Sequence, residues 1–129
     1  MSVCLDSWAI LAWLDGEEPA AQAVDAAFVD ERPWMSWINL GEVAYLLERR
    51  VGAGEADGVV GRLRAALALD DVTPERVLAA ARIKAAHPIA FADCFAAATA
   101  AARGATLYTG DPELLGREVG CRVRDLRGG

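Results

Sequence analysis

The chain has 129 residues, 54% of them hydrophobic, which is enough to bury a sizeable core in one domain without disulfide bonds. Thirteen Lys and Arg residues and nineteen Asp and Glu residues make a net charge of -6, which argues against binding nucleic acid through bulk electrostatics alone. Any nucleic acid must be bound locally. The sequence contains no linker, low-complexity tract or internal repeat, so we expect a single domain over residues 1–129.

Cysteine usage and hydropathy indicate a soluble protein. No basic segment followed by a long apolar one opens the chain, so no signal peptide is visible. The Ala-rich run 89–102 contains Asp93 and is shorter than the roughly 20 residues that a membrane span requires. The cysteines are odd in number and match neither a metal hairpin nor a small disulfide framework, so we expect buried thiols in a reducing cytoplasm at Cys4, Cys94 and Cys121.

The N-terminal region begins with a short apolar run, Val3–Leu5, which predicts a buried strand. Asp6 and Ser7 follow it, at the strand end where open parallel sheets place their ligand crevices. A helix with apolar residues at helical spacing comes next. A second helix is expected from Pro19, which suits a first helical position, to about Asp30.

The middle of the chain continues this alternation. The aromatic run Trp34–Ile38 predicts the second strand, and Asn39 is expected to cap the following helix. Glu42 lies in the first turn of that helix. The apolar spacing then predicts two further elements, a helix over Glu55–Leu67 and a weak third strand over Leu69–Val72.

The C-terminal half carries clear helix boundaries, with a hydroxyl and a proline at Thr73-Pro74 and a terminal glycine at Gly104. Strands that alternate with helices are typical of a mostly parallel sheet covered by helices on both faces. In order, we expect a helix from Thr73 to about Ala86, a helix over Ile89–Arg103, a strand over Thr106–Thr109, a short helical piece around Glu113–Leu115 and an edge strand over Cys121–Leu126.

Four acids share one kind of location, at a strand-to-helix or loop-to-helix transition: Asp6, Glu42, Asp93 and Asp111. In a parallel sheet these transitions lie at one edge, so the four carboxylates can converge. Such a cluster requires protons or metal ions to offset its repulsion, and oxygen ligands without His or Cys suit Mg²⁺ or Mn²⁺. Such ions lower the pKa of a bound water and promote phosphodiester hydrolysis.

Each acid also has a simpler interpretation when taken alone. Asp6 could cap the first helix, Asp111 could start a turn, and Glu42 could favour the helix dipole. Asp93 favours the functional interpretation, because it interrupts an apolar stretch and an unpaired buried acid is costly. If Asp6 binds metal, capping of the first helix falls to Ser7.

Four segments then carry a resemblance that covers essentially the whole chain: the strand into Asp6-Ser7, residues 36–43 (SWINLGEV), 91–98 (FADCFAAA) and 107–114 (LYTGDPEL). In this order and spacing they resemble the PIN-domain ribonucleases, in particular the VapC-type toxins of type II toxin–antitoxin systems. The resemblance implies a three-layer α/β/α fold whose central parallel sheet has four to five strands in the order 3-2-1-4-5.

The resemblance also implies an activity, a metal-dependent cleavage of RNA that leaves a 5′-phosphate and a 3′-hydroxyl. One or two Mg²⁺ or Mn²⁺ ions would be held by the catalytic and metal-binding quartet Asp6, Glu42, Asp93 and Asp111. Polar support would come from Ser7, Asn39 and Thr109, with Glu113 close enough to assist or replace Asp111.

The implied partners are an RNA substrate and a cognate antitoxin whose C-terminal segment occupies the acidic groove, often with an Arg or Lys. A homodimer and a toxin–antitoxin hetero-oligomer are expected by the same analogy, and no membrane. The alternative is an inactive PIN scaffold that binds protein or RNA. A phosphatase of the haloacid dehalogenase type is disfavoured, because Trp8 stands where its second Asp would be.

Overall fold

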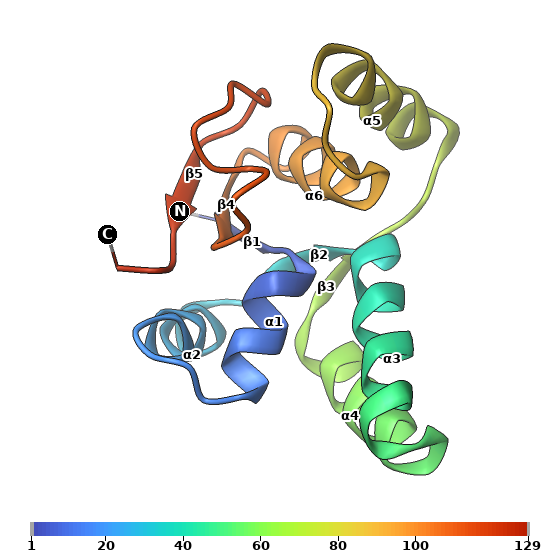
Figure 1. Ribbon diagram of the computed structural model, residues 1–129, viewed down its shortest axis with the longest axis vertical. Helices are drawn as coiled ribbons and strands as arrows, with labels where there is room; N and C mark the ends of the chain where they lie inside the picture. Colours follow the sequence, from blue (N-terminus) through green and yellow to red (C-terminus); the bar gives the residue numbers. More distant parts are fainter. Residues whose placement is uncertain (1, 129) are drawn as a thin grey trace.

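The computed structural model describes residues 2–128, which form five strands and six helices (Figure 1). The strands are β1 (Ser2–Leu5), β2 (Trp34–Ser36), β3 (Ala68–Asp70), β4 (Ala105–Thr109) and β5 (Val123–Asp125). The helices are α1 (Ser7–Leu14), α2 (Ala20–Asp30), α3 (Trp37–Val51), α4 (Ala53–Ala66), α5 (Pro74–Ala86) and α6 (Phe91–Ala102).

The strands form one sheet in the order β3-β2-β1-β4-β5, and every neighbouring pair is parallel. The predicted fold class and strand order are therefore confirmed. Strand β1 lies in the middle of the sheet, with Leu5 in register with Tyr108 of β4 and Cys4 in register with Trp34 of β2. The carboxyl ends of the strands share one edge, where Asp6 leaves β1.

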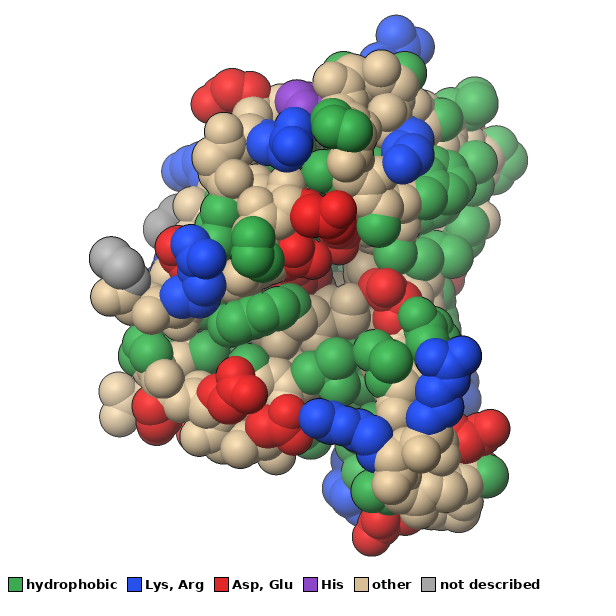
Figure 2. Space-filling model, viewed as in Figure 1, with side chains coloured by type: hydrophobic (Ala, Val, Ile, Leu, Met, Phe, Trp, Pro, Cys, Tyr) green, Lys and Arg blue, Asp and Glu red, His purple; other side chains and the backbone are tan. Residues whose placement is uncertain are grey.

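Helices cover both faces of the sheet, so the fold has three layers (Figure 1). Alternate residues of β1 point to opposite faces: Val3 and Leu5 pack among α1, α2, α3 and α4, whereas Cys4 packs beneath α5 and α6. This alternation produces two separate apolar cores. Between them, acidic side chains gather near the middle of the face seen in Figure 2.

Two predicted helix caps are wrong. Strand β2 ends at Ser36, whose hydroxyl oxygen accepts a hydrogen bond from the backbone N–H of Ile38 at 3.1 Å, so Ser36 caps α3 and Asn39 lies inside the helix. Asp6 caps α1, because its carboxylate accepts a hydrogen bond from the N–H of Ala9 at 2.8 Å. Ser7 is the first helical residue and does not take over the capping.

The remaining boundaries shift by a few residues, with one substantive difference. The segment around 113–115 forms turns, not a helical piece, because Gly116 adopts a φ of 80° and a single turn is too short to propagate.

All three cysteines are free thiols, as expected; Cys4 and Cys94 are buried, but Cys121 is only half-buried.

Within residues 2–128, no single helix has the length and hydropathy of a membrane span. Helices α5 and α6 meet these criteria only as a pair, and their axes are bent by 118°.

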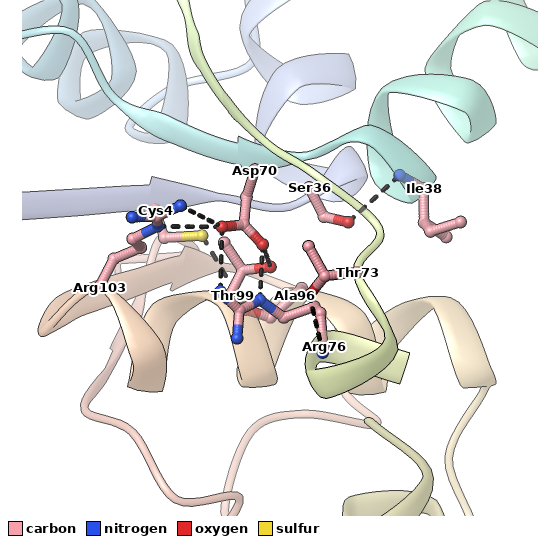
Figure 3. Close-up of polar contacts among 9 residues, drawn as sticks. All are labelled: Cys4, Ser36, Ile38, Asp70, Thr73, Arg76, Ala96, Thr99 and Arg103. Carbon is pink, nitrogen blue, oxygen red and sulfur yellow. Dashed lines mark hydrogen bonds and ion pairs between the residues drawn. The ribbon is translucent and has the colours of Figure 1, made fainter. Parts of the chain in front are cut away.

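One buried acid escaped the sequence analysis. Asp70 ends β3, is 1% exposed, and accepts hydrogen bonds from Arg76 of α5 at 2.6 Å, from Arg103 next to α6 at 2.9 Å and from Thr99 at 3.1 Å (Figure 3). The Arg103 guanidinium also lies 4.1 Å from the centre of the Trp34 ring. Burial raises the pKa of Asp70, but the bonds from Arg76 and Arg103 outweigh it and hold this pKa below its ordinary value.

This cluster ties the edge strand β3 to the α5–α6 layer, so its loss is expected to destabilise the fold. Asp70→Asn removes the charge that pairs Arg76 and Arg103, and we expect the free energy of unfolding in urea to fall by roughly 3 kcal/mol. The control is Asp15→Asn, which breaks the exposed ion pair of Asp15 with Arg50 and is expected to cost less than about 1 kcal/mol. Equal effects of the two substitutions would contradict this role.

Candidate functional site

The centre of the candidate site lies where β1 and β4 end. Asp6 is 1% exposed, and besides capping α1 its carboxylate accepts a hydrogen bond from the hydroxyl of Thr109. The Thr109 hydroxyl oxygen in turn accepts from the backbone N–H of Asp111 at 3.0 Å. One threonine therefore joins two of the predicted acids through a single side chain.

Glu42 is held by one residue of α1 and by one residue of its own helix, α3. Its Oε1 accepts hydrogen bonds from the hydroxyl of Ser7 at 2.7 Å and from the amide of Asn39 at 3.1 Å. The same amide donates to the carbonyl of Ala92, also at 3.1 Å, at the start of α6. Ser7 and Asn39 therefore fix Glu42 of α3 relative to α1 and to the first turn of α6, where Asp93 lies.

Asp93 is 7% exposed and lies with the acids of the turn after β4. Carboxylate oxygens of Asp93, Asp111 and Glu113 lie within 4.8 Å of one another, the one group of this kind among residues 2–128. Asp6 and Glu42 are outside this group, although their charges act on Asp93. Asp111 accepts a hydrogen bond from the N–H of Glu113 at 2.9 Å, which keeps the two acids of the turn together.

The charges of the site are poorly compensated by the protein. Burial is the main cause that raises the pKa of both Asp6 and Asp93 to about 7, and the charge of Asp111 raises both further. Hydrogen bonds from Thr109 and Ala9 offset only part of the shift at Asp6. In the described chain no Lys or Arg forms an ion pair with these acids, in contrast to Asp70.

These residues fit a hard divalent cation. The donors are carboxylate oxygens without His or Cys, which suits Mg²⁺ or Mn²⁺, and a bound cation would supply the positive charge that the protein does not. The side chains whose oxygens lie close enough together to hold it are those of Asp93, Asp111 and Glu113.

Comparison with known families identifies the family to which this chain belongs. The model of the PIN domain family matches residues 3–117, nearly the whole chain. The chain belongs to the PIN domain family. No significant match is found among curated protein sequences.

Solved structures resemble this PIN domain over almost its full length. A chain of DNA-bound VapBC from Salmonella typhimurium has a TM-score of 0.78 at 21% identity, with 98% of each chain covered. VapBC2 from Rickettsia felis, bound to a promoter DNA fragment, has a TM-score of 0.78 at 15% identity and covers 97% of this chain and 98% of its own. VapC20 from Mycobacterium tuberculosis, a sarcin–ricin loop cleaving toxin, has a TM-score of 0.70 at 19% identity, covering 85% and 90%. These likenesses establish the shared fold.

The raised pKa values predict how stability depends on pH when metal is chelated. Between about pH 4 and 7 the folded protein holds protons on Asp6 and Asp93 that the unfolded chain releases. The free energy of unfolding should therefore decrease as the pH rises through this window, by at most about 1.4 kcal/mol per pH unit and group, and level off above it. Urea unfolding in EDTA at a series of pH values measures this slope.

Asp93→Asn serves as the comparison for the pH series, because the amide does not titrate. The variant should show a shallower decrease than the wild type over the same window. Parallel curves for the two proteins would show that Asp93 titrates in its ordinary range.

Proposed function

We propose that this PIN domain is a metal-dependent endoribonuclease and the toxin of a toxin–antitoxin pair. The observation that carries the proposal is that the acids following β1 and β4 and the acids of α3 and α6 gather at one edge of the sheet, where no Lys or Arg among residues 2–128 forms an ion pair with them. A buried cluster of this kind is costly unless it binds a cation. The PIN family membership supports a nuclease, and the VapBC likeness supports the toxin role by analogy.

Each residue has a defined task in this proposal. Asp6, Glu42, Asp93 and Asp111 would hold one or two Mg²⁺ or Mn²⁺ ions, with Glu113 assisting Asp111. When bound, such an ion lowers the pKa of a water molecule and offsets charge on the phosphodiester. The remaining side chains orient the acids: Ser7 and Asn39 hold Glu42, and Thr109 holds Asp6 and the backbone of Asp111.

The substrate class follows from analogy as well. VapC20 cleaves the sarcin–ricin loop, an RNA, and its fold is shared over 85% of this chain. The alternative, an inactive PIN scaffold that only binds, is disfavoured because all four predicted acids are present and lie at one edge of the sheet. Which RNA is cut depends on the groove, and sequencing 5′-phosphate ends after induced expression would identify it.

Metal binding and cleavage are tested together in purified protein. Saturating Mn²⁺ should raise the melting temperature, since a ligand at a hundred times its Kd adds about 2.7 kcal/mol of stability. Asp93→Asn should abolish this rise and lower the rate of RNA cleavage by at least about tenfold to a hundredfold, because even residues that only orient metal ligands have effects of this size.

Glu48→Gln is the matched control, since Glu48 is an exposed acid on α3. It removes one negative charge from the protein and should leave both the Mn²⁺ response and cleavage unchanged. Cleavage by Asp93→Asn at the wild-type rate in a metal titration would refute the assigned site.

We also propose that a cognate antitoxin places a basic side chain in the acidic site. An apolar cleft of about 640 Å³, lined by Trp13, Phe28 and Leu63 among others, offers surface for the rest of such a partner. The antitoxin's C-terminal peptide should inhibit cleavage, and replacing its Arg or Lys should abolish this inhibition, which tests the contact.

Exposed apolar residues such as Leu78, which is 68% exposed, support a homodimer, and light scattering would detect it.

A further inference from the structure

Trp8 and Gly110 make a close contact beside the acidic site. A Cβ atom added to Gly110 would lie 2.3 Å from both Cζ2 and Cη2 of Trp8 and 2.6 Å from its Cζ3. Distances this short are not tolerated, so the six-membered ring of the indole rests directly on the glycine backbone. Any side chain at position 110 would force either the indole or the turn to move.

Position 110 requires a glycine because the Trp8 ring leaves no space for a side chain, not because of its backbone conformation. The glycines with positive φ in residues 2–128 are others, at positions 16, 52, 104, 116, 120 and 128. Gly110 is buried, and its backbone does not need the left-handed region. Gly61 of α4, by comparison, has nothing within 4 Å of an added Cβ.

The contact joins two of the segments from which the site is built, the start of α1 and the turn after β4. Trp8 follows Asp6 and Ser7 in the first turn of α1, and its half-buried ring packs against the core under α1 to α4. Gly110 stands between Thr109 and Asp111. The indole is thus fixed on one side by the core and meets, on the other, the turn that carries Asp111.

We propose that Trp8 is a positioning residue: its indole sets the Gly110 turn and thereby directs the Asp111 carboxylate toward Asp93. Hydrogen bonds alone do not fix this direction. Thr109 holds the backbone of Asp111, and among residues 2–128 the Asp111 carboxylate is bonded only to the N–H of Glu113 within the same turn. The inference rests on the proposed metal-dependent function and deepens it.

A stacking surface for an RNA base is the competing role for an aromatic ring next to such a site. The structure favours positioning, because the ring is half-buried and is already in contact with Gly110 and the core. The two roles differ in what they change: positioning alters metal affinity without RNA, whereas stacking alters only the KM for RNA.

The experiment measures Mn²⁺ affinity from the electron paramagnetic resonance of the free ion, without RNA. Gly110→Ala and Trp8→Ala should each weaken Mn²⁺ binding by about tenfold or more, the size of effect typical of residues that orient metal ligands. Gly61→Ala adds the same methyl group in open space and should bind Mn²⁺ like the wild type.

The double variant tests whether the two residues act through their contact. Trp8→Ala makes room for the methyl of Gly110→Ala, so the double variant should bind Mn²⁺ about as tightly as Trp8→Ala alone. Losses that multiply would overturn the inference. Trp8→Phe keeps a ring at this position and should stay within a few-fold of the wild type, which provides a test if Trp8→Ala does not fold.

Asp93→Asn separates the inference from the function on which it rests. If Asp93→Asn loses Mn²⁺ binding while Gly110→Ala and Trp8→Ala retain it, the positioning role is overturned and the metal site stands. If Trp8→Ala raises only the KM for RNA, the indole is a stacking surface and positioning is likewise overturned. Wild-type Mn²⁺ binding by Asp93→Asn would overturn the proposed function itself.

Discussion

The repulsion among carboxylates at one edge of a parallel sheet is the constraint on which this structure depends. Asp6 is buried at the centre of that edge and Asp93 lies near it on α6, and burial, with the charges of Asp111 and Glu42, raises both pKa values to about 7. Neutral donors, Thr109, Ser7 and Asn39, orient the cluster, and no basic side chain in residues 2–128 forms an ion pair with it. Such a site favours a proton or a cation, which couples its charge to pH and to metal.

Asp70 shows how the same fold treats an acid that serves structure. It is as buried as Asp6, yet Arg76 and Arg103 pair with it and keep its pKa low. The carboxylate therefore stays charged and joins β3 to the layer above it. The contrast lies in the partners: two guanidinium groups compensate one acid, while the acids around Asp93 have none within the described chain.

The sequence predicted the parts of this protein that local patterns encode. Apolar runs and helix boundaries placed the strands and helices to within a few residues, and family resemblance supplied the strand order. The predicted helix caps were wrong where two neighbouring polar residues could each cap the same helix. Ser36 caps α3, so Asn39 is released to bond Glu42, and Asp6 caps α1 while Ser7 bonds Glu42. Spacing along the chain does not decide such competition, since each candidate has suitable chemistry.

The sequence by itself determined the order of the chemical groups: which acids follow strands, and which apolar runs supply the cores. Tertiary structure alone decided which groups meet. Thr109 bonds Asp6 across 103 positions, and Asn39 bonds Ala92 across 53. It also revealed the contact between Trp8 and Gly110, because the parallel strands β1 and β4 bring their carboxyl ends, and the residues that follow them, to one edge.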